Sequence, residues 1–225
     1  MHALPEPPVP PAPAAGLRIG AVLLAAGAAS RMGHRPKCLL EREGRPLVRR
    51  QLDALAAAGV APVVVVLGHY RERIGAAIAG ADVVRVVNPD PGAPQNASLH
   101  RGLGALPEGL DAVLVTLADL PLIGAAEIGA LIGAWRHRPA GTRFVRPWVE
   151  GQPGHPVLFE AGVRDEMLRA GAAGTGPAWA AAHPQAVHRW PSANTNHVCD
   201  VDSPQDLAAL AAQGIALRWP DDLAG

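Results

Sequence analysis

The sequence predicts an α/β protein with a Rossmann-like, three-layer fold and a mostly parallel central sheet. Apolar, strand-sized runs recur along the chain, segments with helical spacing alternate with them, and several strands end at glycine or aspartate. With 225 residues, the chain is long enough for one large domain and too short for two full-sized enzymatic domains. We therefore expect a single domain over residues 17–225, preceded by a disordered, proline-rich tail over residues 1–16.

The composition argues against several classes of protein. The 20 Lys+Arg residues balance 20 Asp+Glu residues, so the chain lacks the net positive charge that favours non-specific binding to nucleic acid or membranes. No apolar run approaches the roughly 20 residues of a spanning helix, and residues 1–16 do not have the pattern of a secretory signal. Two cysteines are too few for a disulfide scaffold. We expect a cytoplasmic protein with neither nucleic acid nor membrane as a partner.

The first elements follow one another in βαβ order. Residues 17–26 form an apolar strand that ends at Gly27, and residues 45–59 have helical spacing of apolar side chains. Such alternation implies right-handed crossovers between parallel strands. The further expected elements are a strand at 62–67, a short helix at 71–79, a strand at 83–87, a loop at 88–97, a helix from near Ser98 and a strand at 112–117.

The pattern changes after an expected helix at residues 125–135. Residues 143–159 are typical of two strands around a Gly/Pro turn, which we interpret as a small β insertion over the active site. A strand-like segment at 198–201 precedes the last helix, for which Ser203 is the expected N-cap and Pro204 the first helical residue. Asp206 stands where a capping box places its acidic residue.

A glycine-containing loop follows the first predicted strand. Residues 24–33 have the sequence LAAGAASRMG, and Lys37 follows. Ligands of open α/β sheets bind beyond the carboxyl ends of the strands, where a glycine lets backbone amides approach a phosphate. Arg31 and Lys37 would add positive charge. The spacing fits neither a P-loop nor a dinucleotide fingerprint, and the alternative interpretation is an ordinary turn with two solvated cations.

Two aspartates are expected near the same edge of the sheet. Asp119 ends an apolar strand, where an unpaired carboxylate would be costly, and Asp202 lies just before the last helix. Since Mg²⁺ binds one or two protein carboxylates together with substrate phosphates, we predict a magnesium site at Asp119 and Asp202. Asp200 competes as the second ligand, because strand alternation would place it on the same face as Asp202. Helix capping is the alternative role for these residues.

The stretch from Leu24 to Leu40 resembles the LAAG-x-x-S-R-M-G-x-x-x-K signature of the molybdenum cofactor nucleotidyltransferases, a MobA-like NTP transferase family. Ala26 and residues 46–48 look more like its CTP:molybdopterin cytidylyltransferase branch than its guanylyl branch, which favours CTP over GTP. Further segments that agree in order and spacing are Asn88-Pro89, Ser98-Leu99, Gly102-Leu103, and residues 117–121, 154–157 and 200–207.

The resemblance implies a Mg²⁺-dependent transfer of CMP from CTP to a molybdopterin-type phosphorylated substrate, with release of pyrophosphate. It implies catalytic roles for Arg31, Lys37 and Asp119, and metal binding by Asp119 and Asp202. A molybdoenzyme or its maturation factor would receive the product. The implied nucleotide-binding residues are Leu24, Ala25, Ala26, Gly27, Arg31, Lys37 and Ser98, and the implied substrate-binding residues are Gly154, His155 and Pro156.

Two segments depart from the family pattern. Residues 94–97 read PQNA where many cytidylyl relatives have a Gly-Met or similar pair, and residues 171–177 read GAAGTGP where they have G-D-x-G-A-R. An acidic and a basic residue are therefore absent, which bears on the acceptor more than on the reaction type. The alternatives are a sugar-1-phosphate or other small-phosphate nucleotidyltransferase, and a non-catalytic, cofactor-binding chaperone.

Overall fold

A computed structural model describes residues 16–223 of the chain. The tail predicted over residues 1–16 lies outside the described residues, apart from Gly16. Within the described range, no helix has both the length and the apolar character needed to cross a membrane. The central sheet contains β1 (Ile19–Ala25), β4 (Val63–Leu67), β5 (Val84–Val87), β6 (Ala112–Leu117), β7 (Phe144–Val149), β8 (Gln152–Pro153), β9 (Val157–Glu160) and β10 (Val187–Pro191).

The strands of this sheet lie in the order β10-β7-β9-β6-β1-β4-β5, and β8 pairs with β7. Strand β1 is parallel to both β4 and β6, and β5 is parallel to β4. In this order of seven strands, β9 alone runs antiparallel to its neighbours, which are β6 and β7. The predicted mostly parallel sheet is therefore confirmed. Because β1, β4 and β6 run in one direction, their carboxyl ends meet at a single edge, where such folds bind ligands.

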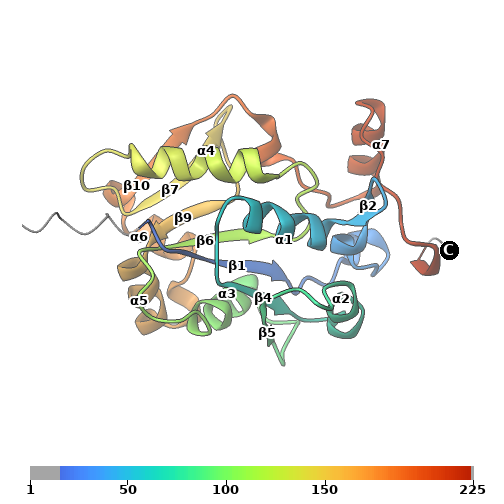
Figure 1. Ribbon diagram of the computed structural model, residues 1–225, viewed down its shortest axis with the longest axis horizontal. Coiled ribbons are helices and arrows are strands. Elements are labelled where there is room, and N and C mark those ends of the chain that lie inside the picture. Colours follow the sequence, from blue (N-terminus) through green and yellow to red (C-terminus); the bar gives the residue numbers. More distant parts are fainter. Residues whose placement is uncertain (1–15, 224–225) are drawn as a thin grey trace, which may run out of the picture.

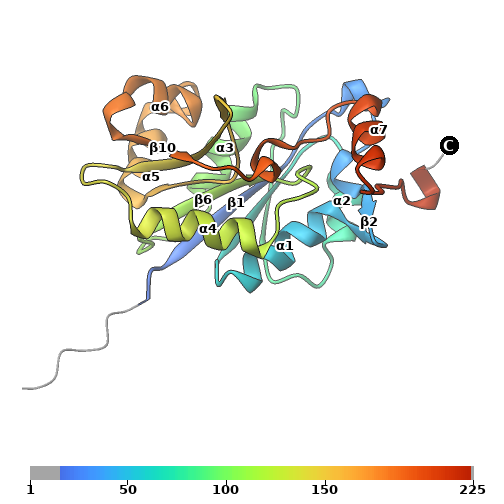
Figure 2. The ribbon, with the colours of Figure 1, turned by 90° about the horizontal axis from the view of Figure 1, so that it is seen from above.

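Helices cover both faces of the sheet, which gives the predicted three layers (Figures 1 and 2). One face carries α1 (Leu47–Ala57), α2 (Arg71–Ala77) and α4 (Ala125–Arg136), and the other carries α3 (Gln95–Gly104), α5 (Ala161–Ala170) and α6 (Pro177–Ala182). Strand β1 contributes to both cores, because successive side chains of a strand point to opposite faces. Leu23 packs into the first core and Val22 into the second.

Two packing features fix the elements around the carboxyl edge of the sheet. Helix α3 lies close to β1 and β4 at Gly102, where an added Cβ would come within 2.6 Å of Val22 and 2.8 Å of Val66. A separate buried cluster joins Met32 and Leu40 to Val201 and to Leu210 of α7 (Pro204–Ala212). In Figure 1, α7 accordingly lies at the end of the molecule where the loop after β1 is found. The sequence between residues 26 and 40 is therefore anchored to the last helix.

Several element boundaries differ from the sequence predictions. The first helix begins at Leu47 and not at residue 45, because β2 (Glu41–Arg42) and β3 (Arg45–Pro46) pair as a short hairpin. Helix α3 begins at Gln95 and not near Ser98. The predicted start of α7 is confirmed, with Ser203 and Asp206 as its capping box and Pro204 as its first residue.

The strand predicted at residues 198–201 is wrong. The chain forms a 3-10 helix there, Thr195–Val198, and continues without regular structure to Ser203. The side chain of Asn194 caps this turn by accepting a hydrogen bond of 3.0 Å from the backbone amide of Asn196. Strand alternation therefore does not relate Asp200 to Asp202.

The two strands predicted within residues 143–159 are present as β7 and β9. They belong to the central sheet, because β9 pairs with β6 through four residue pairs from Ala112↔Glu160 to Val115↔Val157. The bend between β8 and β9, which contains His155, lies beside the second of the two pockets described below.

Candidate active site

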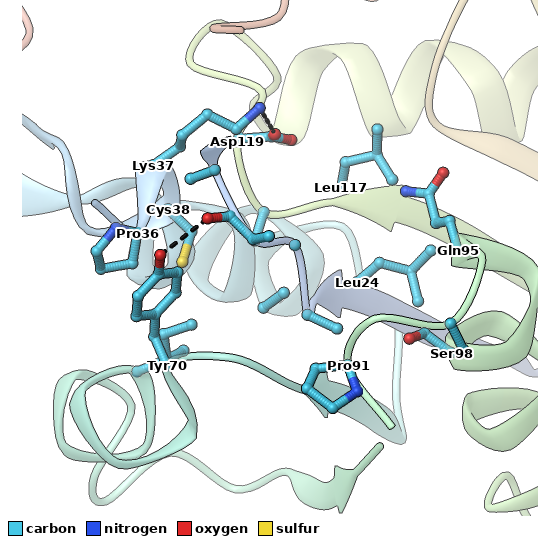
Figure 3. A pocket seen from close by; sticks show the side chains of 18 residues that line it. Leu24, Pro36, Lys37, Cys38, Tyr70, Pro91, Gln95, Ser98, Leu117 and Asp119 are labelled. Carbon is cyan, nitrogen blue, oxygen red and sulfur yellow. Dashed lines mark hydrogen bonds and ion pairs between the residues drawn. The ribbon is translucent and has the colours of Figure 1, made fainter. Parts of the chain in front are cut away.

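A pocket of about 250 Å³ lies at the carboxyl ends of β1 and β6. Residues 24–29 form one side of it, and residues 36–38 and 117–119 form another. Figure 3 shows Lys37 and Asp119 at one end of this pocket, with Gln95 and Ser98 at the other end. The segments come from distant parts of the sequence and meet because their strands are neighbours in the sheet.

The loop after β1 leaves open space above Gly27. An added Cβ at Gly27 would meet no atom within 4 Å, and its backbone does not have a positive φ. Neither packing nor backbone conformation therefore requires glycine at this position, whereas a ligand close to the backbone would. At Gly68, by contrast, a Cβ would come within 2.5 Å of the carbonyl oxygen of Ala26. The end of β4 thus packs tightly beneath the loop and supports it.

Tyr70 holds this loop in place from the segment that follows β4. Its hydroxyl oxygen lies 2.8 Å from the carbonyl oxygen of Ala28 and 2.6 Å from that of His34, so its single proton is donated to one of the two at a time. Burial raises the pKa of Tyr70, which keeps the phenol protonated as a donor. The loop therefore has a defined shape without a ligand.

Lys37 lies between the two aspartates that the sequence selected. Its Nζ is 2.7 Å from Oδ2 of Asp119 and 2.7 Å from Oδ1 of Asp202, and its side chain is only 15% exposed. Burial alone would lower the pKa of Lys37, but the two carboxylates outweigh it and hold this pKa above its usual value. Lys37 is also the only lysine of the chain. The ammonium therefore stays charged and acts as the counter-ion of both acids.

Asp202 pairs with a second cation, and its backbone is held by Asp206. Arg31 Nη2 donates a hydrogen bond of 2.6 Å to Asp202 Oδ2. The hydrogen bond from Lys37 and the charges of both cations hold the pKa of Asp202 below its usual value, although partial burial acts against them. The backbone amides of Asp202 and Ser203 donate to Asp206, at 2.9 and 2.7 Å. The capping box of α7 thereby fixes the backbone that carries Asp202.

The carboxylates of Asp119 and Asp202 fit a divalent cation. One ammonium touches both, so they converge on a position of the size of a single cation. No group of three or more histidine, cysteine or acidic residues arranged to hold a metal occurs within residues 16–223. Two carboxylates are the usual protein share of a Mg²⁺ site that is completed by water and phosphate. Partial desolvation, and then the charges of Asp202 and Asp119, raise the pKa of Asp200. Within residues 16–223, Lys37 forms ion pairs with Asp119 and Asp202 but not with Asp200.

Glu127 connects the two segments that carry the aspartates. Its Oε1 accepts hydrogen bonds from the side-chain amides of Asn194, at 3.0 Å, and Asn196, at 2.8 Å. Its Oε2 accepts one of 2.9 Å from the backbone amide of Gly124. Burial acts to raise the pKa of Glu127, but these hydrogen bonds prevail and lower it. The segment after Asp119 is thus tied to the segment that leads to Asp202.

Replacing Glu127 with glutamine should loosen this connection while keeping the shape of the side chain. The NH₂ group of glutamine would face N–H groups that themselves need an acceptor, so the expected loss of stability is about 1–3 kcal/mol. We expect a lower Tm and, at temperatures where the variant is folded, a lower kcat with nucleotide affinity nearly unchanged. Glu108→Gln, at an exposed glutamate, is the matched control. Equal behaviour of the two variants would show that Glu127 does not position the aspartates.

A second pocket of about 400 Å³ adjoins the first and shares Leu24, Gln95 and Leu117 with it. Its walls are mainly apolar and aromatic, and His155 is one of its few polar residues. Burial, and then the nearby charge of Arg146, lower the pKa of His155 to about 4. The imidazole is therefore neutral at physiological pH. The two pockets are neighbours that share part of their walls.

The structure brings most of the predicted site residues together. Arg31 and Asp202 do not line the first pocket. Asp202 is linked to it by an ion pair with Lys37, and Arg31 is linked to it by an ion pair with Asp202. Of the predicted substrate-binding residues, only His155 lines a pocket; Gly154 is needed for packing, since a Cβ there would come within 2.8 Å of the carbonyl oxygen of His197. The predicted residues that line the first pocket are Leu24, Ala25, Ala26, Gly27, Lys37, Ser98 and Asp119.

Sequence reasoning missed four residues of this region: Gln95, Tyr70, Glu127 and Arg146. Gln95 lies in the PQNA segment that departs from the family pattern, and Tyr70 is the only tyrosine in the sequence. Neither the unusual PQNA segment nor the single tyrosine indicates a chemical role by itself. Glu127 and Arg146 act through contacts with distant segments, which no local pattern reveals.

The fold and the loop after β1 place the chain among the nucleotidyltransferases. Residues 21–187 match the MobA-like NTP transferase domain family, and the chain belongs to this family. The solved structure of Rv0371c from Mycobacterium tuberculosis superposes with a TM-score of 0.71 at 25% identity, covering 87% of this chain and 98% of that one. The predicted family and fold are therefore confirmed.

Three named proteins are similar in sequence to parts of this chain. Nicotine blue oxidoreductase of Paenarthrobacter nicotinovorans is 35% identical over 150 residues, which cover 64% of this chain and 71% of that protein. Bifunctional protein GlmU of Rhodococcus opacus is 38% identical over 52% of this chain. CMP-5'-(3-aminopropyl)phosphonate synthase of Streptomyces rubellomurinus is 44% identical over 35% of this chain. The matched part spans only 25% of GlmU and 14% of the synthase.

Proposed function

We propose that this protein is a cytoplasmic, Mg²⁺-dependent molybdenum cofactor cytidylyltransferase, which transfers CMP from CTP to the phosphate of a molybdopterin-type acceptor and releases pyrophosphate. The observation that carries the proposal is the convergence of the loop after β1, Lys37 and two aspartates at one end of a pocket that adjoins a second one. Transfer between two substrates requires such neighbouring sites.

In this reaction, an oxygen of the acceptor phosphate attacks the α-phosphorus of CTP in line with the leaving pyrophosphate. The open backbone at Gly27 binds phosphate oxygens, and Arg31 and Lys37 offset the negative charge that builds on the triphosphate. Asp119 and Asp202 would hold Mg²⁺, which supplies further charge stabilisation at the phosphates when bound. The protein forms no covalent bond, and its residues act by position and charge.

CTP is favoured over GTP by two observations. Ala26 stands in the loop where the guanylyl branch that the sequence resembles has glycine. The relative with 44% identity over part of this chain is named as a synthase of a CMP conjugate. Ala26 is part of the lining of the first pocket.

The second pocket supports a planar acceptor. Phe144, Phe159 and several aliphatic side chains line it, and such walls suit the faces of a heterocyclic ring. Each hydroxyl of a sugar would need a polar partner, and polar side chains are in the minority here. This lining favours a pterin over a sugar 1-phosphate.

The test is pyrophosphate release by the purified protein with Mg²⁺, molybdopterin cofactor and each NTP separately. Turnover chiefly with CTP supports the proposal, whereas turnover chiefly with GTP would assign the guanylyl branch. A parallel series replaces the cofactor with sugar 1-phosphates. Faster turnover in that series would overturn the acceptor assignment, and nucleotide binding without release in any mixture would favour a chaperone.

A further inference from the structure

The Arg146 side chain faces the second pocket without a partner. Arg146 lies on β7, is partly buried and contributes to the pocket lining. Its buried Nε has no hydrogen-bond partner among residues 16–223. Across residues 16–223, no carboxylate pairs with its guanidinium group, whereas Arg143, at the start of the same segment, pairs with Glu160 and Glu166.

The surroundings of Arg146 do not compensate for its charge. Burial, and then the positive charge of Arg189, lower the pKa of Arg146. Arg189 is its direct neighbour on β10 and is itself exposed, stacked 4.7 Å over Trp148. His155, whose buried Nδ1 also has no partner, is neutral. The pocket therefore has a positive region within mainly apolar walls.

An arginine in such a setting is costly without a ligand. A buried donor that lacks a partner destabilises a protein, and more so when the donor is charged. Arg164, another buried arginine, also has an unpartnered Nε among residues 16–223, but its two Nη atoms donate to the carbonyl oxygens of Leu106 and Pro107. The guanidinium fork of Arg146 is instead free to bind an oxyanion through two parallel hydrogen bonds.

We propose that Arg146, together with His155, binds a second anionic group of the acceptor, remote from the phosphate that receives the nucleotide. The preferred acceptors are then compounds with a phosphate at one end, a planar apolar body, and an oxyanion at the other end. The proposal rests on the proposed function in one respect, because it places the acceptor phosphate beside Lys37 in the adjoining pocket.

Two small probes test this assignment by binding alone. Phenyl phosphate and 4-carboxyphenyl phosphate share the phosphate and the ring, and only the second has a carboxylate at the far end. Dissociation constants are measured by titration calorimetry at neutral pH with Mg²⁺, without a nucleotide. We expect 4-carboxyphenyl phosphate to bind the wild-type protein about tenfold more tightly, a common size for one charge-assisted contact.

Three variants show whether the preference comes from Arg146. Arg146→Gln should reduce it to less than about twofold, and Arg146→Lys should retain part of it, because lysine keeps the charge but loses the fork. Arg189→Gln is the control. It also removes one positive charge, but from an exposed position on the neighbouring strand, and it should keep most of the preference for 4-carboxyphenyl phosphate. The folded state of each variant is checked by its Tm.

The results also separate this inference from the proposed function. Equal affinity for both probes in the wild-type protein, no binding of either probe, or a preference that survives in Arg146→Gln would overturn the inference. The inference would also be overturned if Arg189→Gln lost as much of the preference for 4-carboxyphenyl phosphate as Arg146→Gln does. A preference that depends on Arg146 in a protein that releases no pyrophosphate would uphold the inference and refute the proposed function.

Discussion

Replacing Asp119 with alanine is expected to lower kcat by roughly 10²–10³-fold, the scale on which loss of one preorganised electrostatic group slows an enzyme. Asp119 lies two residues after the end of β6, 2.7 Å from Lys37, and lines the first pocket. Its carboxylate would act where charge develops during transfer, so its loss should affect the transition state more than the ground state. The affinity for CTP should therefore change far less than kcat.

Kinetics of pyrophosphate release and calorimetry with CTP measure these two effects separately. Asp82→Ala is the matched control, because Asp82 is exposed and lies away from both pockets. A near wild-type kcat in Asp119→Ala would remove Asp119 from the catalytic residues. An equal loss of kcat and of CTP affinity would make it a nucleotide-binding residue only.

The parts of the fold that were predicted correctly are those with a local cause. β1, β4 and β6 are apolar runs buried on both faces, so each run of sequence was sufficient to identify a strand. The capping box of Ser203 and Asp206 is likewise contained within four residues. Asp119 was found because a carboxylate directly after such a strand is conspicuous.

The parts that were missed depend on distant contacts. β10 has a proline and alternately half-buried residues, and it is a strand because it pairs with β7. Residues 198–201 look extended in sequence, yet Val198 ends a 3-10 turn over residues 195–198. Asn194 and Asn196 hold this turn by hydrogen bonds to Glu127, which is more than 60 residues away. That Arg146 has no ion-pair partner within residues 16–223 becomes visible only once the positions of the carboxylates in that range are known.

Under the proposed function, Lys37 would have different roles in the free and the nucleotide-bound protein. In the free protein its ammonium neutralises Asp119 and Asp202, which would otherwise repel each other across a partly buried site. A divalent cation held by these carboxylates would displace the ammonium, which would then be available for the triphosphate. We therefore expect Lys37 to compete with the metal before it assists the reaction.

Lys37→Met is therefore expected to change metal affinity and turnover in opposite directions. Methionine keeps most of the side-chain volume but removes the charge, so Mn²⁺ no longer competes with an ammonium and should bind about tenfold more tightly without nucleotide, a change of ~1.4 kcal/mol.

In the same variant, kcat should fall by roughly 10²–10³-fold, because the triphosphate loses a cation in a site that works by charge. Titration of Mn²⁺ by electron paramagnetic resonance measures the first effect, and Arg101→Met, at an exposed arginine on α3, is the control. Unchanged or weaker Mn²⁺ binding in Lys37→Met would show that the metal does not bind between Asp119 and Asp202. Since simple damage to the site would weaken both properties, only a true competition between ammonium and metal produces the opposite changes.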